Sequence, residues 1–489
     1  MPTYAPNCRY GVAAWGESQL QWLPKLGIGW YLDFGAHMSN GPDDIEFIQV
    51  VRVKQNKSGC TYLPGYSVSP PLTEGDLGAL VRAYPGALWL VGNEPDRGPN
   101  PDSDCTNRIQ DDTHPEVYAE AYHAVYHFIK QRDPTAQVGI AGLVQVTPGR
   151  LQYLDKVWDT YLQKFGVPIP VDVWNMHLYI LPEVNWTGQP NGIANVALGT
   201  NPALGMRESG GRKDLCGDPR DNIYCFAEHD NMPIFADQIL QMRAWMKAHG
   251  QQNKPLIISE YSILYPFEDY DDPIHPTRCF LQDEFGGCFT PARVSNFMTR
   301  TFHYLESAAD PVLGYPPDNY RLVQQWLWFS MYFEGAGSAS NLLNRDMTSL
   351  TQVGQIFANF VGSTATYVNL LPGEVANPVI FAPTGTTGVT LSATIYNNGN
   401  AYARNPITVT FYADASLTQI IGTSVFTGTL EGCARRGITL EVYWDNLSTG
   451  AHPYWVKVEG DEYKEDNIKA GLVLVNPKQV FLPLTLRQK

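Results

Sequence analysis

The sequence predicts an α/β fold over residues 1–370, a (β/α)8 TIM barrel, followed by an all-β, immunoglobulin-like sandwich over residues 371–489. A chain of 489 residues exceeds one ordinary hydrophobic core, which favours two or three domains. Up to about residue 335, short apolar segments alternate with amphipathic helical segments. Beyond residue 388, apolar residues recur at every second position, which is the period of a β-strand.

Eight short apolar segments of the first part are predicted to be buried strands. They are residues 11–15, 29–34, 45–53, 87–92, 137–143, 171–177, 255–260 and 323–329. Segments with apolar residues three and four positions apart predict helices over 114–132, 151–165, 234–249, 291–307 and 350–361. Strands that alternate with helices favour a parallel sheet, and eight of them predict a closed barrel. Stretches rich in Gly, Pro, Asn and Asp at 185–232 and 264–290 are predicted loop insertions.

The second part begins with a segment rich in Pro, Gly and Thr at residues 370–388, as expected of a linker or domain entry. Strands about 8–12 residues apart with Asn-Gly turns then predict a β-sandwich. Residues 395–414 and 459–467 resemble the CARDB adhesion modules of secreted proteins. That resemblance implies an accessory domain that serves attachment, spacing or stabilisation.

Charge and hydropathy exclude two classes of partner. The net charge is −15 and Lys and Arg form no cluster, whereas phosphate binding needs concentrated positive charge. We therefore expect neither nucleic acid nor anionic membranes as partners. No apolar run approaches the ~20 residues of a membrane span, so membrane insertion is not expected. The first residues lack a basic segment followed by an apolar one, so we expect a signal peptide to be absent or removed.

The eight cysteines indicate an oxidising environment. Cys216 and Cys225, and likewise Cys279 and Cys288, lie nine residues apart in loops rich in Gly, Asp and Pro. This spacing predicts two local disulfides and an extracellular or cell-surface protein, although free buried thiols are the alternative. No Cys-x-x-Cys pair and no zinc-type His spacing occurs, so neither a metal nor another cofactor is predicted.

Two predicted strands end in a glutamate. Glu94 follows the fourth strand, after Gly92 and Asn93, and Glu260 ends the seventh. The carboxyl ends of barrel strands converge on one face, and strands four and seven lie nearly opposite. A carboxylate at the end of a buried strand is costly unless it faces a hydrated cleft or an arginine. Two such carboxylates suit glycoside hydrolysis, in which one is a protonated acid and the other an ionised nucleophile or base.

Asn-Glu-Pro at residues 93–95, together with Ser-Glu-Tyr at 259–261, resembles the retaining glycoside hydrolases of clan A. The resemblance covers about residues 10–335. It implies that Glu94 is the acid/base, Glu260 the nucleophile and Asn93 a ligand of the sugar 2-hydroxyl. It further implies cleavage of β-glycosidic bonds in a poly- or oligosaccharide by double displacement, for which the two carboxyl groups lie ~5–5.5 Å apart.

The ends of strands six and eight supply the remaining predicted site residues. His177 and Tyr179 share one face by alternation and reach the mouth of the barrel. By the resemblance they contact the nucleophile or the substrate; the alternative is that loop backbone satisfies them. In strand eight, Trp326 and Trp328 share one face. The resemblance implies that Trp328 forms the floor of the sugar subsite, and Trp326 is predicted to lie in the barrel interior.

A rival hypothesis is a non-catalytic carbohydrate-binding or cell-surface adhesion protein on a barrel scaffold. It explains the surplus of aromatic residues, which include 12 Trp and 27 Tyr. It does not explain a matched pair of glutamates. Under either hypothesis the expected partner is a carbohydrate, and the sequence predicts no oligomeric state.

Overall fold

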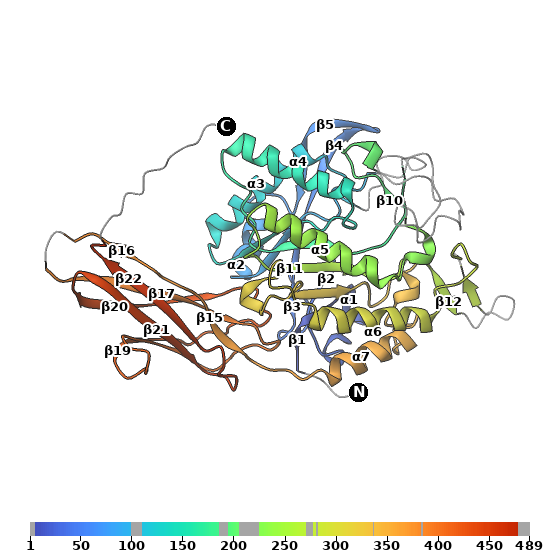
Figure 1. Cartoon of the computed structure of the whole chain (residues 1–489). Coiled ribbons are helices and arrows are strands. Elements are labelled where there is room, and N and C mark those ends of the chain that lie inside the picture. Colours follow the sequence, from blue (N-terminus) through green and yellow to red (C-terminus); the bar gives the residue numbers. More distant parts are fainter. Residues whose placement is uncertain are drawn as a thin grey trace, which may run out of the picture. The chain divides into compact units, whose positions relative to one another are not determined.

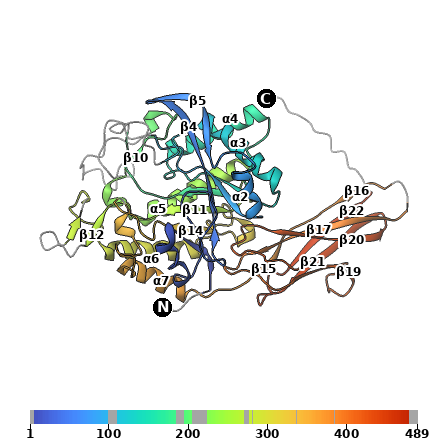
Figure 2. The same ribbon diagram turned by 180° about the vertical axis from the view of Figure 1, so that it is seen from behind.

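The computed structural model describes residues 5–98, 110–184, 194–204, 224–269, 277–279, 282–335, 337–382 and 385–477. The chain forms two compact units, Met1–Ala365 and Thr366–Lys489 (Figures 1 and 2). The predicted boundary, between residues 370 and 371, falls instead within the second unit. The reason is β15 (Leu370–Val375), which pairs with β17 (Thr387–Asn397) and so belongs to the all-β part.

Among the described residues of the first unit, nine parallel strand segments form a ring of eight positions, in which β3 and β4 share one position. In ring order they are β1 (Asn7–Ala13), β2 (Ile28–Leu32), β3 (Glu46–Phe47) with its continuation β4 (Gln49–Ser58), β6 (Leu88–Val91), β7 (Gln137–Ile140), β8 (Trp174–His177), β11 (Leu256–Tyr261) and β14 (Gln325–Trp328). The ring closes where β14 pairs with β1 and where one parallel bridge joins Gly139 to Val173. Each predicted strand overlaps one of these segments, and the predicted α/β class is confirmed.

Helices lie between the ring strands and, in the case of α7, after the last of them. They are α1 (Gly16–Leu20), α2 (Leu77–Ala83), α3 (Pro115–Arg132), α4 (Pro148–Phe165), α5 (Met232–Ala248), α6 (Pro291–Ser307) and α7 (Gln352–Ser363) (Figure 1). Proline in the first turn of α3 to α6, and the Thr290 and Thr351 side chains that cap α6 and α7, explain where these helices begin.

The described connections depart from strict alternation in five places. The helix α1 has only five residues, and the described residues 33–45 between β2 and β3 contain no helix. The strand β4 continues into an antiparallel hairpin with β5 (Thr61–Ser69). In the predicted insertions, β9 (Glu183–Val184) pairs with β10 (Ala194–Asn195), and β12 (Phe267–Asp269) pairs with β13 (Thr277–Cys279).

The first unit has an inner and an outer core. The inner core lies inside the ring and consists of alternate strand residues such as Trp30, Leu90, Ile257 and Leu327, all buried. A Cβ on Gly11 would lie 2.5 Å from Cε2 of Trp30. Glycine at this position therefore leaves room for the Trp30 indole inside the ring of strands. The other strand faces pack against the helices in a larger cluster.

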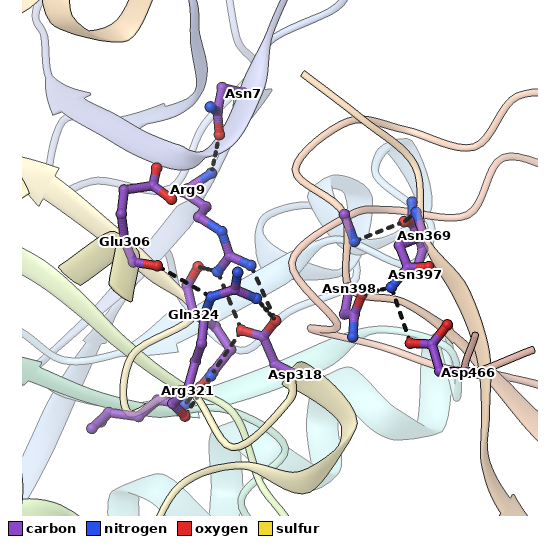
Figure 3. A network of polar contacts seen from close by, with 12 residues as sticks. Asn7, Arg9, Glu306, Asp318, Arg321, Gln324, Asn369, Asn397, Asn398 and Asp466 are labelled. Carbon is purple, nitrogen blue, oxygen red and sulfur yellow. Dashed lines mark hydrogen bonds and ion pairs between the residues drawn. The ribbon is translucent and has the colours of Figure 1, made fainter. Parts of the chain in front are cut away.

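A buried ion pair joins the amino-terminal ends of two neighbouring ring strands. Arg9 of β1 donates through Nη1 and Nη2 to Asp318 (3.2 and 3.0 Å), and through Nη1 to the carbonyl of Gln324 (3.1 Å) just before β14 (Figure 3). Arg321 donates to the same carboxylate (3.0 Å). This fork-like pairing ties β1 to the segment before β14, where the ring closes.

The second unit is a sandwich of two sheets, as predicted. One sheet has the order β15–β17–β20 (Ile438–Leu447). The other has the order β16 (Val379–Ile380), β22 (Ile468–Val475), β21 (Gly450–Glu459), β18 (Ile407–Tyr412) and β19 (Ile420–Phe426). Their core includes Leu391, Ile395, Phe411 and Val456. Outside this core, Asn369 donates to Asn398 (2.7 Å) and Asp466 (3.1 Å), also drawn in Figure 3.

The predicted disulfide between Cys279 and Cys288 is present. Cys225 is also disulfide-bonded, but Cys216 lies outside the described residues, so their pairing stays a prediction. None of the described cysteines is free. Among the helices of the described ranges, none combines the length and the apolarity needed to cross a membrane.

Candidate active site

Three titratable side chains meet at the carboxyl ends of β6, β8 and β11. His177 Nδ1 lies 3.0 Å from Glu94 Oε1 and 3.6 Å from Glu260 Oε2. One oxygen from each glutamate and a ring nitrogen of His177 all lie within 4.8 Å of one another. The Tyr179 hydroxyl donates to Glu260 Oε1 (2.7 Å). The structure thus brings together four side chains that the sequence predicts for one site, and all four are buried.

The backbone of Glu94 is strained. Its φ is 44°, a left-handed conformation that residues with a side chain rarely adopt, and Gly92, two residues earlier, has a φ of 93°. Such a conformation costs about 1–3 kcal/mol and persists where surrounding contacts hold it. Here the Glu94 amide donates to the carbonyl of Gly142 (3.0 Å), and the Asn93 amide donates to Asp111 (2.7 Å). Asp111 is in turn held by Arg52 Nε (2.6 Å).

Asn93 lies beside Glu94 and is almost fully buried. Its Nδ2 donates to Gln110 Oε1 at 2.7 Å, a partner that sequence reasoning missed because no motif marks it. Its role as a 2-hydroxyl ligand stays a proposal.

Charge and burial shift the pKa values of Glu94 and Glu260 in opposite directions. Burial, together with the charge of Glu94, raises the pKa of Glu260 from its ordinary 4.5 to about 7. Burial also acts to raise the pKa of Glu94, but the hydrogen bond and positive charge of His177 outweigh it, so this pKa is lowered. Burial lowers the pKa of His177, and the charges of Glu260 and Glu94 more than compensate, so it is raised. At a pH between the lowered pKa of Glu94 and the raised pKa of Glu260, the proton therefore resides on Glu260 rather than on Glu94.

These shifts predict a pH-dependent stability. A group whose pKa is raised on folding stabilises the fold below its unfolded pKa, and this contribution is lost as the pH rises through the folded pKa. For Glu260 the loss falls between pH 4.5 and about 7, and the raised pKa of His177 acts in the same direction above pH 6.5. The lowered pKa of Glu94 matters only below pH 4.5.

We therefore expect Glu260→Gln to stabilise the protein more at pH 8 than at pH 5, because the variant carries no carboxyl to ionise. Urea denaturation of wild type and variant at both pH values measures the two differences. Equal differences at pH 5 and pH 8 would contradict a raised pKa for Glu260.

A second buried cluster consists of Asp96, two residues beyond Glu94, with Arg150 and Glu183. Arg150 Nε lies 2.9 Å from Asp96 Oδ2, and Arg150 Nη1 donates to Glu183. All three side chains are fully buried. Burial and the charge of Glu94 raise the pKa of Asp96 to about 6, although Arg150 opposes this shift. The cluster joins the loop after β6 to the first turn of α4 and so supports the segment that carries Glu94.

The prediction for the two tryptophans of strand eight is wrong. Trp326 and Trp328 belong to the outer core, where Trp326 contacts Tyr10, and Trp328 contacts Tyr261 and Phe302 of α6. The Trp328 indole donates to the carbonyl of Ser340 (2.9 Å), and its ring is fully buried. Neither side chain therefore lies in the barrel interior or forms a subsite floor.

The inward face of β14 belongs to Leu327 and, directly after the strand, Phe329, both members of the inner core. The aromatic residue at this strand end is thus Phe329, which sequence reasoning missed. No local signal distinguishes this face from the other, because both faces carry apolar residues.

The comparisons with known proteins concern the fold. No protein-family model matches the sequence, and no curated protein matches it. Among solved structures, those of glycoside hydrolases are similar. An endo-β-1,3-glucanase of family GH128, subgroup II, from Pseudomonas viridiflava is 14% identical, covers 72% of this chain and 98% of its own, and has a TM-score of 0.41.

A glucosidase from Croceicoccus marinus is 11% identical and covers 91% of this chain and 94% of its own, with a TM-score of 0.41. A further similar structure is the CARDB domain of a Pyrococcus furiosus protein, solved with di-metal ions. That domain is 14% identical and covers 23% of this chain and 97% of its own, with a TM-score of 0.19.

Proposed function

We propose that the protein is a retaining β-glycosidase built on a clan A (β/α)8 barrel, with Glu94 and Glu260 as its catalytic pair. The observation that carries the proposal is the buried pair of carboxylates whose nearest oxygens lie within 4.8 Å. Retaining enzymes place their carboxyl groups ~5–5.5 Å apart, whereas inverting enzymes need ~6.5–9.5 Å to admit a water. Oxygens this close allow both carboxylates to act on one glycosidic bond, and retention is what the resemblance to clan A implies.

The mechanism is a double displacement. Glu260 attacks the anomeric carbon, the glycosidic bond breaks, and the departing oxygen takes the proton of Glu94. Glu94 then removes a proton from water, which attacks the same carbon and releases Glu260. Because the Tyr179 hydroxyl binds Glu260 Oε1, the other carboxylate oxygen is left for the attack.

These roles require a protonated Glu94 and an ionised Glu260, which is the reverse of what the two pKa shifts favour. His177 is placed to move a proton between the two carboxylates. Its Nδ1 contacts both carboxylates, at 3.0 and 3.6 Å. When Nδ1 gives its proton to Glu94 and takes the proton of Glu260, the nucleophile becomes ionised and the acid protonated. Positive charge that develops at the anomeric carbon, next to Glu260, favours that distribution.

The direct test is release of reducing ends from a panel of β-linked poly- and oligosaccharides, with Glu260→Ala run in parallel. We expect cleavage by the wild type, loss in the variant and a product of retained anomeric configuration by NMR. Activity should survive a chelator, because the mechanism uses no metal; the cluster of Glu94, His177 and Glu260 is also one that a divalent cation would fit. Binding without cleavage would instead support the non-catalytic hypothesis.

A glycine beneath His177 provides a further test. A Cβ on Gly142 would lie 2.2 Å from Cδ2 of the imidazole and 2.6 Å from its Nε2. We expect Gly142→Ala to displace the ring and lower kcat/KM by about 10²-fold, the cost of a ~1 Å misplacement. The matched control is Gly149→Ala, where the nearest atom lies 3.7 Å from the new Cβ and activity should not change. Equal activities of the two variants would contradict a role for the position of His177.

The proposal also covers the localisation of the protein, the role of its second unit and its partner. The disulfide between Cys279 and Cys288 supports secretion or cell-surface display, since such bonds persist in oxidising compartments. The sandwich of the second unit then serves as a CARDB-like accessory module. The partner of the first unit is a carbohydrate.

A further inference from the structure

Four aromatic rings gather just beyond the carboxyl ends of β1, β2 and β14. Trp15 contacts Phe34, Phe329 and Phe333, with ring centroids 6.0, 6.0 and 5.9 Å away. The rings of Trp15 and Phe34 are stacked, with an angle of 25° between their planes. Phe333 is 38% exposed, Trp15 and Phe34 are half-buried, and Phe329 lies beneath them, 8% exposed. Together these four residues are called the aromatic rim.

The aromatic rim continues directly from the nucleophile. Ring order places β14 beside β11, and β1 and β2 beyond β14. The amide of Phe329 donates to the carbonyl of Tyr261 (3.0 Å), the residue after Glu260. The aromatic rim therefore follows the strand ends away from Glu260, on the side opposite to β8 and its His177.

A polar pair lies against the aromatic rim. The Trp15 indole donates to the backbone carbonyl of Asp33 (3.0 Å), whose carboxylate Oδ2 lies 2.6 Å from His37 Nε2. The His37 side chain is 52% exposed. Oδ1 of the same carboxylate accepts from the amide of Gly35 (3.1 Å), which fixes its orientation. Ring faces beside a fixed, accessible carboxylate–imidazole pair suit a ligand with apolar faces and hydroxyl edges.

We propose that the aromatic rim, with Asp33 and His37 at its edge, binds sugar rings of a glycan chain next to the bond that is cleaved. This inference rests on the proposed function and adds the direction in which the substrate runs, from Glu260 across β14 and β1 to β2. A chain long enough to reach Trp15 and Phe34 gains contacts that a disaccharide lacks. A long glycan should therefore bind more tightly than a short one.

The test uses Glu260→Ala, which binds without cleaving, and glucose oligomers of two and six units with β-1,3 or β-1,4 linkage as probes. Calorimetry should show that the six-unit oligomer of the preferred linkage binds at least about tenfold more tightly, equivalent to ~1.4 kcal/mol. Adding Trp15→Ala should abolish this difference, and Trp15→Phe should keep part of it. Tyr320→Ala, at a 42% exposed aromatic residue before the amino-terminal end of β14, is the matched control and should change nothing.

Two outcomes would overturn the proposal. One is a six-unit oligomer that still binds more tightly than the two-unit oligomer, by the full factor, in Trp15→Ala and Phe34→Ala. These variants must melt at the same temperature as the parent, which shows that they are folded. The other is equal affinity for both lengths in the parent itself. The proposed function fails separately, when the wild type cuts none of the glycans. The binding measurements are then made on the wild type instead of Glu260→Ala. A difference in affinity between the six-unit and two-unit oligomers that is lost in Trp15→Ala still supports the aromatic rim.

Discussion

Replacing Glu260 with alanine is expected to reduce kcat by about 10⁴-fold or more, the scale at which loss of a nucleophile acts. The reason is that no other described side chain at the site is placed to form the covalent intermediate. Azide should restore turnover by occupying the space of the lost carboxylate and attacking the anomeric carbon directly. Because one displacement replaces two, the glycosyl azide should have inverted configuration, which NMR detects.

Glu94→Ala is the companion experiment, with an aryl glycoside whose leaving group needs no acid. Here the covalent intermediate still forms on Glu260, and azide takes the place of the activated water. The expected glycosyl azide has retained configuration. If the two configurations are exchanged between the variants, the roles of Glu94 and Glu260 are reversed; if azide rescues neither variant, the catalytic pair is wrong.

Replacing Arg150 with methionine is expected to lower the free energy of unfolding of the first unit by about 3–5 kcal/mol, because it leaves buried carboxylates without their counter-charge. Arg150 is 1% exposed and contacts both Asp96 and Glu183. Urea denaturation followed by tryptophan fluorescence suits the measurement, since ten of the twelve tryptophans lie in the first unit. Neutralising the partners in the triple variant with Asp96→Asn and Glu183→Gln should restore much of the loss.

The matched control is Arg345→Met. Its partner Glu334 lies 3.6 Å away, and the two side chains are 68% and 73% exposed. An exposed pair contributes between zero and about 1 kcal/mol, so the variant should unfold close to the wild type. A loss of similar size in Arg150→Met and Arg345→Met would show that the buried cluster does not stabilise the loop after β6 more than a surface pair does.

The sequence predicts those features that local patterns determine. Buried strands of a parallel sheet are short, continuous apolar runs, which is why all eight ring strands could be located. A charged residue at the end of such a run is conspicuous, so Glu94 and Glu260 could be identified. Alternation then placed His177 and Tyr179 on the same side as these glutamates.

The burial of ring strands on both faces also explains what could not be predicted. A strand that is buried on both faces carries apolar residues at every position, so alternation does not distinguish the inside of the ring from the outside. Trp326, Leu327 and Trp328 of β14 and Phe329 directly after it are all apolar, and the choice of the tryptophans followed residue type rather than register. Contacts between distant segments, such as that of Arg150 with Asp96, leave no local pattern at all.

The left-handed backbone at Glu94 also restricts how this protein can evolve. Glycine adopts a φ of 44° without steric cost, and asparagine tolerates it better than glutamate does. Glycine or asparagine at this position would relieve the backbone strain, but either would also remove the proposed acid and the carboxylate that pairs with His177. Under the proposed function, selection for catalysis therefore keeps a glutamate at a position where the backbone alone favours glycine.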